Sequence, residues 1–558
     1  MLLKAILSIA LTVSWAHALR LSVGSGGQTI RALLDESTSS PLTKRDDTDP
    51  ALLFPAHNLS VPVDHFHNDT LYEPHSNATF DLRYWFDATY YRRGGPVIVL
   101  QSGETSGEGR LSFLQKGILH QLAVATHGIG VVIEHRYYGT SMPTPDLSTE
   151  NLRFLTTAQA LADEAYFAQH IKFPGLECYG DLSSNTTAYI GYGGSYAGAF
   201  NAFLRVLYPD IFWGTISSSG VTKAIYDYWE YYSPIAEYMP AACSTAQKTF
   251  TRMVDNILIG KNDPSLTHSL KSAFGLPNVT HNDDFANILS SGISGWQSLN
   301  WDPSLSSPSF YRFCDNLTST TLLYPGTAYL RSSAEDLLTA GNFTPTHDLT
   351  AQLLNYIGYI NLTQVSRCTH LNYTQDECFT TRDPTQYQGT SWASQTWRSW
   401  AYQYCTEWGY LQTGSGVPAD QDPLISRTIT LEYTSLVCHY AFNRTTPPDT
   451  DRINQYGGYD ISYPRLALVD GEQDPWKPAT PHAFAQGAKD RVSTTSEPFI
   501  LIEGGVHHWD ENGLWPNETT ADLPPAPVRE AQEQEVEFVK AWMREWRESC
   551  AEMGRWWW

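Results

Sequence analysis

Basic residues are scarce in this chain of 558 residues, in which 36 Lys and Arg face 59 Asp and Glu and the formal charge is −23. An acidic surface of this kind repels nucleic acids and anionic membranes, which are therefore not expected as partners. It suits a soluble protein in a mildly acidic medium, although solubility alone explains it equally well. Charged residues make up only 17 % against 42 % apolar residues, which excludes wholesale disorder and provides a large core. The length corresponds to three or four domains of ~150 residues, or to one large domain with an insertion.

Beyond its N-terminus the sequence has no long hydrophobic run, so we expect no membrane span. The first residues combine a positive charge at Lys4, an apolar run over 5–15 and the small-x-small motif Ala16-His17-Ala18. This order is typical of a secretory signal peptide, residues 1–18, because the run is shorter than the ~20 residues of a spanning helix. Residues 19–55 follow either as a pro-segment cut at the dibasic pair Lys44-Arg45 or as a disordered linker. The protein is expected outside the cell, or in the lumen of a vacuole or lysosome.

Cysteine is sparse as well, since the chain has 8, and none of them forms the Cys-x-x-Cys spacing that binds zinc. An even number is compatible with disulfides in an oxidising compartment. Two pairs are close in sequence and two more would complete a set, although sequence alone does not fix the connectivity: Cys368 with Cys378, Cys405 with Cys438, Cys243 with Cys314, and Cys178 with Cys550. Secretion also agrees with the Asn-x-Ser/Thr sites along the chain, which predict a glycosylated surface at Asn58, Asn68, Asn77, Asn185, Asn278, Asn316, Asn342, Asn361, Asn372, Asn443 and Asn517.

Short β-branched runs alternate with helical spacings in the first half of the chain. We predict strands at 95–100, 130–134 and 187–192 and a helix at 157–170, a pattern typical of βαβ units and a mostly parallel sheet. From about 225 to 440 the sequence becomes rich in Trp, Tyr, Ser and Thr and holds most of the cysteines. Strand character returns at 465–469 and 498–502. The simplest arrangement is one α/β domain (56–224 and 451–558) interrupted by a helical, disulfide-bonded cap (225–450).

A candidate nucleophile follows the third predicted strand, in Gly193-Gly194-Ser195-Tyr196-Ala197. A serine between small residues at a strand-to-helix turn is the nucleophile-elbow arrangement, in which the strained turn projects the hydroxyl. The amide of Tyr196 at the start of the next helix would then face a developing oxyanion. Ala197 departs from the usual G-x-S-x-G pattern but is still small. A glycine-rich turn with a solvent-facing, non-catalytic serine would have the same sequence pattern.

A serine hydroxyl needs a base that a carboxylate orients, and in α/β hydrolases these follow in the order Ser, Asp, His after later strands. Asp474 and His507 arrive in that order after the two returning strands. Asp470 and Asp510 are rival acids, the first too near its strand and the second beyond the histidine. His508 is a rival base that spacing does not exclude.

Several motifs in one order resemble the prolyl carboxypeptidase and dipeptidyl-peptidase II family of serine peptidases. The resemblance runs from about residue 61 to 510, with the cap as its loosest part. It is carried by Val63-Asp64-His65-Phe66, Arg83-Tyr84-Trp85, Ser102-Gly103-Glu104, Glu134-His135-Arg136-Tyr137-Tyr138-Gly139, Leu155-Thr156, Gln159-Ala160-Leu161-Ala162-Asp163, Gly193-Gly194-Ser195-Tyr196, Tyr404-Cys405-Thr406-Glu407, Tyr456-Gly457-Gly458, Gly471-Glu472-Gln473-Asp474-Pro475-Trp476 and Gly505-Val506-His507-His508.

The resemblance implies an α/β-hydrolase fold with a helical cap, the triad Ser195, Asp474 and His507, and cleavage next to proline. It also favours His507 over His508, and it suggests a second oxyanion donor in the loop at Gly103. The candidates for substrate binding are Glu104 and Glu407 for a free amine, and Trp476, Trp397 and Trp400 for a proline pocket. Each of these side chains could equally be structural.

We expect no metal and no cofactor. The H-x-H spacing of His65 and His67 permits a metal ligand pair, but a strand that presents alternate residues accounts for it better. The predicted function is a secreted serine peptidase that acts on proline-containing peptides as a carboxypeptidase, a dipeptidyl-peptidase or an endopeptidase. The sequence is compatible with a homodimer. A carboxylesterase or lipase of the same fold, and an inactive binding module, are the alternatives.

Overall fold

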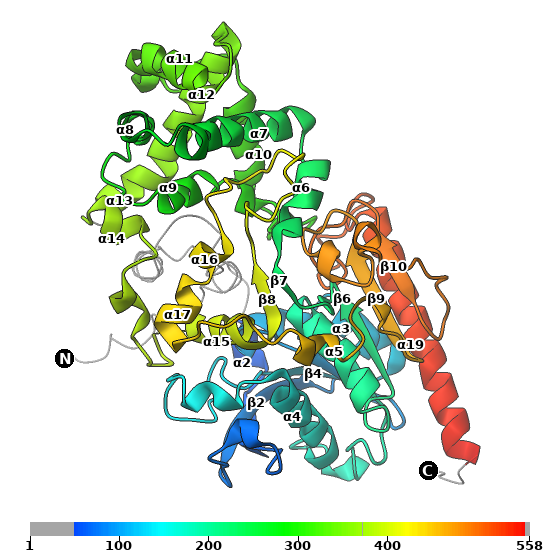
Figure 1. Cartoon of the computed structure of the whole chain (residues 1–558). Coiled ribbons are helices and arrows are strands. Elements are labelled where there is room, and N and C mark those ends of the chain that lie inside the picture. The colour runs from blue at the N-terminus through cyan, green and yellow to red at the C-terminus, as the bar shows by residue number, and fades with distance from the viewer. Residues whose placement is uncertain (1–48, 371, 395, 553–558) are drawn as a thin grey trace, which may run out of the picture.

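The computed structural model describes residues 49–370, 372–394 and 396–552 (Figure 1). The predicted signal peptide and the Lys44-Arg45 pair lie outside these residues. A short helix, α2 (Pro50–Leu53), falls at the end of the segment predicted as pro-segment or linker. Within the described residues no helix combines the length and apolar character of a membrane span.

An eight-stranded sheet forms the centre of the chain, in the order β1-β2-β4-β3-β5-β6-β9-β10. The first two strands are antiparallel to their neighbours, and all pairs from β4 to β10 are parallel. The strands are β1 (His57–Pro62), β2 (Thr79–Asp87), β3 (Val97–Gln101), β4 (Ile129–Ile133), β5 (Tyr189–Gly194), β6 (Gly214–Ser218), β9 (Leu466–Gly471) and β10 (Phe499–Ile502). The predicted strands at 95–100, 130–134, 187–192, 465–469 and 498–502 are therefore confirmed within two residues, whereas β1, β2 and β6 were not predicted.

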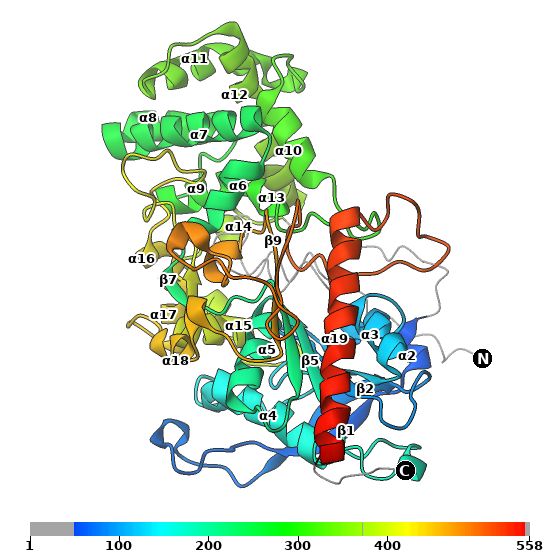
Figure 2. The same cartoon turned by 90° about the vertical axis from the view of Figure 1, so that its right-hand side faces the viewer.

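Helices cover both faces of the sheet, which is why the parallel strands read as continuous apolar runs. Along β3, Val97 and Val99 face the cluster that contains α4 (Thr157–His170) and α5 (Tyr196–Leu207). Ile98 and Leu100 face the opposite cluster, which contains α3 (Ile118–Thr126) and the long C-terminal α19 (Ala526–Glu552). Figure 2 shows α19 lying alongside α3 on that face. The predicted helix at 157–170 is confirmed at both ends.

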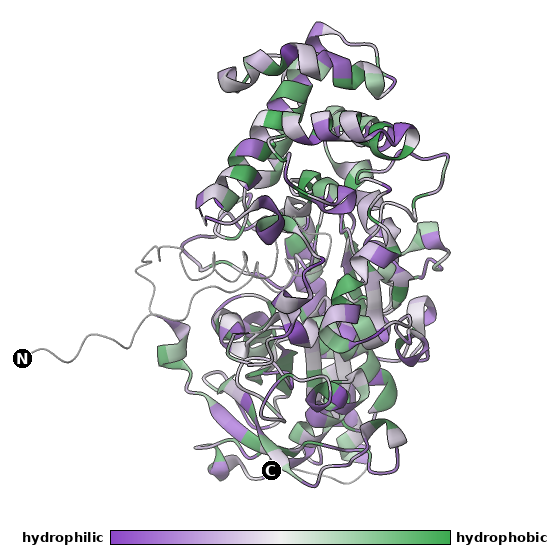
Figure 3. Ribbon diagram, turned by 60° about the vertical axis from the view of Figure 1, so that its left-hand side comes forward, coloured by the Kyte–Doolittle hydropathy of each residue, from purple (hydrophilic) through white to green (hydrophobic). Residues whose placement is uncertain are grey.

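Between β6 and β9 the chain leaves the sheet and builds a helical cap (Figure 1). A small parallel pair, β7 (Ile225–Asp227) with β8 (Gly409–Leu411), connects the cap to the sheet region. The cap helices carry alternating hydrophobic and hydrophilic residues, typical of helices that pack on one side only (Figure 3). They are α6 (Tyr232–Tyr238), α7 (Ala241–Asp255), α8 (Pro264–Ala273), α9 (Asn282–Leu289), α10 (Ser309–Thr318), α11 (Arg331–Ala340), α12 (His347–Ile360), α13 (Ser366–His370), α14 (Gln375–Phe379), α15 (Trp397–Gln403), α16 (Leu431–Thr434), α17 (Leu436–Phe442) and α18 (Asp451–Asn454).

Two of the four expected disulfides are formed, and both lie in the cap. Cys243–Cys314 joins α7 to α10, and Cys405–Cys438 joins the π-helical turn Tyr404–Trp408 to α17. The expected Cys178–Cys550 bond is absent, because Cys178 is a free, exposed cysteine. The expected Cys368–Cys378 bond is also not formed, although both residues are buried and the Cys368 thiol lies within hydrogen-bonding distance of Cys378.

Candidate functional site

The predicted catalytic residues converge on one edge of the sheet. Strands β5, β6, β9 and β10 are consecutive and parallel, so their carboxyl ends lie at the same edge. Ser195 follows β5 directly, Asp474 lies three residues after β9, and His507 lies five residues after β10. Loops at the carboxyl edge of an open parallel sheet are the usual place for a ligand site in α/β proteins.

Ser195 occupies the strained turn that its motif predicts. Its φ of 63° and ψ of −124° lie outside the regions that a serine normally adopts, and its side chain is partly exposed. A Cβ on Gly193 would lie 2.3 Å from the carbonyl oxygen of Ala197, so strand and helix can meet only at a glycine. A Cβ on Gly198 would lie 2.5 Å from the Ser218 oxygen. The second close approach therefore falls on Gly198, which explains why alanine is tolerated at 197.

Asp474 and His507 form a buried pair. The Nδ1 of His507 is 2.8 Å from Oδ2 of Asp474, and Oδ1 of Asp474 accepts the Trp476 amide at 2.8 Å. Burial by itself would raise the pKa of Asp474, but the charge and hydrogen bond of His507, together with the Trp476 amide, hold it below its usual value. The carboxylate is thus ionised. With Nδ1 donating to it, Nε2 of His507 is left as the basic nitrogen, and this atom is buried without a hydrogen-bond partner among the described residues.

The rival acids and the rival base are engaged elsewhere. Asp470 lies 2.5 Å from Nδ1 of His482, and Asp510 accepts hydrogen bonds from Ser218 and Tyr192. His508 forms an ion pair with Glu511 at 2.9 Å; burial opposes its charge, but Glu511 raises its pKa above the ordinary value. Of the acids and bases that the sequence offered for the triad, only Asp474 and His507 are therefore paired with each other.

Two serines at the end of β6 connect the nucleophile turn to this acid–base pair, and sequence reasoning missed both. The Ser195 amide donates to the Ser218 carbonyl at 2.9 Å. The next residue, Ser219, accepts the His508 amide on its hydroxyl at 2.9 Å and also hydrogen-bonds the Asp474 carboxylate. Ser219 has a φ of 44°, a left-handed conformation that turns its hydroxyl toward the loops. A run of three serines before glycine at 217–220 was the available signal.

The two predicted oxyanion donors differ in the structure. Tyr196 is the first residue of α5, where an amide has no partner within the helix. Gly103 lies beside the elbow, because a Cβ there would be 3.6 Å from that of Ala197. Its amide, however, donates to Oε1 of Gln101 at 2.8 Å, since a φ of +71° turns the chain back on itself. In this conformation the Gly103 amide is therefore engaged, and a second oxyanion donor from this loop stays a prediction.

The two glutamates predicted to bind a substrate amine have different surroundings. Glu104 is partly exposed and lies near Arg110, His507 and His508. Burial raises the pKa of Glu104, and these three neighbours oppose the rise. Glu407 is 3 % exposed, and its carboxylate accepts the amide and hydroxyl of Thr157 at 3.0 and 3.1 Å. Glu407 thus caps the N-terminus of α4, and the prediction that it binds an amine is wrong.

The three tryptophans predicted to line a proline pocket lie in different surroundings. Trp476 packs face to face with Tyr228 and has its ring centroid 6.4 Å from that of His507. Trp400 meets Tyr196 edge to face at 5.7 Å. Trp397 is buried against Tyr387 in the cap, which makes it a core residue rather than a pocket residue.

Further aromatic residues missed by the sequence reasoning surround this region. Tyr231 and Tyr410 both pack against Trp476, at 5.4 and 5.1 Å. The indole N–H of Trp476 donates to Gln297 at 2.9 Å, and the same Gln297 oxygen accepts the Tyr231 hydroxyl at 2.9 Å. These contacts fix the rings in place. The aromatic run 226–232 was the signal for the tyrosines, but sequence alone does not show which ring faces the site.

The distinctive stretch 134–139 is a scaffold behind the site. The buried carboxylate of Glu134 accepts from the Arg83 side chain and from the amides of Gly107, Thr140 and Ser141. A Cβ on Gly139 would lie 1.9 Å from that carboxylate, and the φ of +56° also requires glycine.

His135 and Arg136 in the same stretch extend the scaffold to α4 and to the elbow. Arg136 forms a buried bidentate pair with Asp163, at 2.5 and 2.6 Å. Burial lowers the pKa of His135 to about 4, so it is neutral. Its Nδ1 faces the Arg136 carbonyl at 2.7 Å and therefore carries the proton, and Nε2 accepts the Tyr196 hydroxyl at 2.9 Å. The stretch thus holds the residue that follows the candidate nucleophile.

Buried acids behind the site give a stability prediction with a definite sign. Burial raises the pKa of Glu164 to about 8, and Glu164 touches Gln101, the residue that holds the Gly103 amide. The folded protein therefore keeps a proton on Glu164 between its unfolded pKa and about 8, whereas the unfolded chain has lost it. The contribution of Glu164 to the free energy of unfolding therefore falls as the pH rises through that interval, by about 1.4 kcal/mol per pH unit. The pKa values of Asp510 and Glu535 are raised by burial as well, with the same sign.

We expect the melting temperature to fall from pH 5 to pH 8, and Glu164→Gln to make that fall smaller, because glutamine stays neutral throughout. Thermal unfolding across this pH range, followed by circular dichroism, measures both slopes. Glu533→Gln, on the exposed face of α19, is the matched control and should leave the wild-type slope unchanged. Equal slopes for wild type and Glu164→Gln would contradict the prediction.

The strand order, the elbow at the end of β5 and the cap between β6 and β9 define the chain as an α/β hydrolase. The sequence model of the family "Serine carboxypeptidase S28" matches residues 62–523, so the chain belongs to that family and is a serine-type peptidase. A "Probable extracellular serine carboxypeptidase" of Arthroderma benhamiae is 55 % identical over 492 residues, 88 % of this chain and 68 % of that protein. "Serine protease vicPb" of Bipolaris victoriae is 29 % identical over 80 % of this chain and 82 % of its own length.

The comparisons also find more distant similarities. "Thymus-specific serine protease" of Mus musculus is 24 % identical over 88 % of both chains. Among solved structures, proline iminopeptidase of Mycobacterium smegmatis matches 88 % of this chain and 99 % of its own, at 12 % identity and a TM-score of 0.36. That score is too low to add to what the strand order already defines.

Proposed function

We propose that this protein is an extracellular serine carboxypeptidase that cleaves next to proline, with Ser195 as nucleophile, His507 as base and Asp474 as the orienting acid. The observation that carries the proposal is the 2.8 Å pair of Asp474 with His507, at the sheet edge where Ser195 sits in its strained turn. The family description and the name of the Arthroderma relative support the carboxypeptidase mode and the extracellular location. The Asn-x-Ser/Thr asparagines support secretion, because none of them is buried.

In the proposed reaction, Nε2 of His507 takes the hydroxyl proton of Ser195 while Ser195 Oγ attacks the substrate carbonyl carbon. Asp474, ionised and bonded to Nδ1, stabilises the imidazolium. The Tyr196 amide stabilises the oxyanion, together with the positive end of α5. His507 then returns the proton to the leaving amine, and water hydrolyses the acyl-enzyme on Ser195.

The proline preference rests on the aromatic residues beside His507. Trp476 lies beside His507 with Tyr228, Tyr231 and Tyr410 packed against it, and all four side chains are buried in this conformation. Flat apolar rings of this kind suit the pyrrolidine ring of a bound proline. Glu104 stays a candidate for contact with a substrate amine, because it lies close to both histidines and is partly exposed. A dipeptidyl-peptidase mode is therefore the second candidate.

A panel of matched peptides tests the mode and the specificity together. One peptide has proline before a free C-terminal residue and a blocked N-terminus; a second has a free Xaa-Pro N-terminus and an amidated C-terminus; a third has internal proline and both ends blocked. We expect the first to be cleaved fastest, and replacement of its proline by alanine to lower kcat/KM by about 10- to 200-fold. Fastest cleavage of the second or third peptide would overturn the carboxypeptidase mode, and equal rates for proline and alanine would overturn the proline preference.

A further inference from the structure

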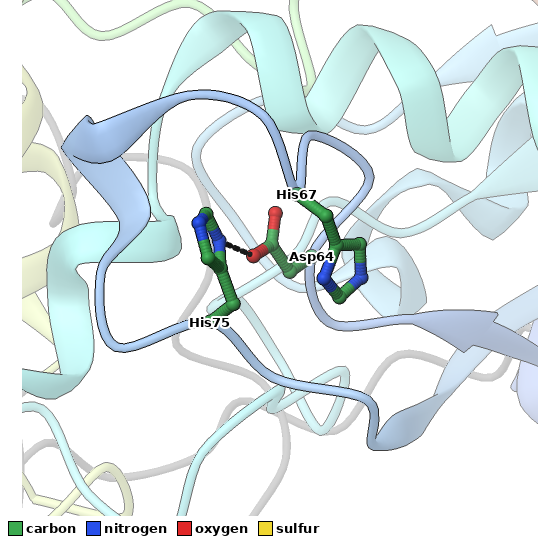
Figure 4. A group of neighbouring side chains, drawn as sticks. All are labelled: Asp64, His67 and His75. Carbon is green, nitrogen blue, oxygen red and sulfur yellow. Dashed lines mark hydrogen bonds and ion pairs between the residues drawn. The ribbon is translucent and has the colours of Figure 1, made fainter.

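A cluster of one aspartate and two histidines lies apart from the proposed catalytic residues, in the segment between β1 and β2. The candidate ligand atoms of Asp64, His67 and His75 all lie within 4.8 Å of one another. Figure 4 shows the Asp64 carboxylate between the two imidazole rings. Asp64 is buried, His75 is partly buried and His67 is exposed, so the cluster opens to solvent on one side.

The carboxylate of Asp64 is held in a fixed orientation. Its Oδ1 accepts the Phe66 amide at 2.9 Å and the Gln159 side-chain amide at 2.9 Å. Its Oδ2 faces Nδ1 of His75 at 2.8 Å. One oxygen is thus occupied by supporting hydrogen bonds and the other is directed at the histidines, which is the arrangement of a metal-binding carboxylate with its outer shell in place.

The histidine pair suggested by the sequence is not the pair that the structure brings together. Residues 63–69 do not form a strand, so the expectation that His65 and His67 merely alternate along one is wrong. His65 binds Asp163 at 2.8 Å and belongs to the scaffold of Arg136. His67 instead has its ring centroid 5.4 Å from that of His75, a residue that sequence spacing did not single out.

We propose that Asp64, His67 and His75 bind a divalent cation of the zinc type. Two imidazole nitrogens and one carboxylate oxygen form a ligand set that Zn²⁺ prefers, with water in the fourth position. Tetrahedral ligands at about 2.0–2.2 Å from zinc lie roughly 3.3 Å apart, so His67 must rotate inward and His75 must move slightly away from Asp64. The exposed side chain of His67 has room to do so.

The cation would join the two ends of the segment 64–75. In the structure this segment is held to α4 through Gln159, which bonds Asp64 and also accepts the His65 amide. A cation at Asp64 would therefore stabilise the segment against the helix that carries Asp163 and Glu164. The role of the cation would be structural and independent of peptide hydrolysis. A failure to bind zinc would therefore leave the proposed peptidase function untouched, and a failure of that function would leave the zinc site untouched.

Zinc titration of the full-length secreted protein tests this site, with isothermal calorimetry for affinity and thermal unfolding for stabilisation. Wild type, His67→Ala and His75→Ala are compared at about pH 7.5, where imidazoles are mostly neutral. Both substitutions avoid the buried aspartate and should leave the fold intact. His347→Ala is the matched control, because His347 pairs with Asp348 on the cap surface and is 78 % exposed.

We expect wild type and His347→Ala to bind one zinc with equal affinity and to gain thermal stability from it. Each variant in the cluster should weaken that affinity at least about 10-fold and lose the gain in melting temperature. Binding that is the same in all four proteins, or no binding to wild type, would overturn the site.

Discussion

Ser195→Ala should lower kcat/KM on the best proline peptide by about 10⁴-fold or more, because removal of a catalytic serine removes the acyl-enzyme route altogether. The side chain is partly exposed in a turn whose φ of 63° alanine can adopt no worse than serine, so the fold should persist. Steady-state kinetics on purified protein measures the loss. Circular dichroism and thermal unfolding of the same samples show whether the fold is retained.

Ser269→Ala, an exposed serine of α8 in the cap, is the matched control and should retain wild-type kinetics. A Ser195→Ala protein that turns over peptide within tenfold of wild type would show that another group is the nucleophile. A loss of the same size in Ser269→Ala would point to a preparation artefact rather than to catalysis.

Asp474→Asn should lower kcat by about 10⁴-fold while changing KM little, since the carboxylate acts on the imidazolium that forms in the transition state. The asparagine keeps the shape but removes the charge that faces Nδ1 of His507 at 2.8 Å. In wild type, burial opposes the charge of Asp474, but the contact with His507 holds the pKa of Asp474 below its usual value, so the carboxylate keeps its charge at mildly acidic pH.

Asp470→Asn makes a matched comparison, because Asp470, in strand β9 itself, is also a buried aspartate and is paired with His482. Its loss should affect stability, because the His482 contact is buried, but kcat per folded molecule should stay near wild type. If Asp470→Asn abolished turnover and Asp474→Asn did not, the acid would be Asp470.

Sequence predicted the parts of the site that depend on chain order. Ser195, Asp474 and His507 follow β5, β9 and β10 of one parallel sheet, and chain order alone places them at one edge. The elbow was predictable because close backbone contacts at Gly193 demand a residue without a side chain. The cap was predictable from the change in composition near residue 225 and the return of strands near 465.

What sequence could not predict depends on contacts between distant residues. Glu407 became a cap for α4 because a segment 250 residues away presents the amide of Thr157 to it. The choice between His507 and His508 depends on Glu511, whose charge pairs with the latter. Gly103 turned its amide toward Gln101 through a local left-handed conformation that no spacing rule specifies.

The cysteines and the histidines of the N-terminal segment illustrate the same limit. Cys405–Cys438 was predicted from proximity in sequence, yet Cys368 and Cys378, which are closer in sequence, are not joined by a disulfide. His75 was overlooked because the chain returns to Asp64 only after a turn of eleven residues. Pairings of this kind follow from the three-dimensional path of the chain, not from local pattern.

The central claim is that Ser195 is an activated nucleophile, and covalent labelling with a fluorophosphonate tests it most directly. Such a probe phosphonylates a serine only where a base and an oxyanion site act on it, and mass spectrometry of the digested protein locates the adduct. We predict one adduct, on Ser195, that is lost in Ser195→Ala and strongly slowed in Asp474→Asn. An unlabelled wild-type protein, or an adduct on a different serine, would contradict the assignment.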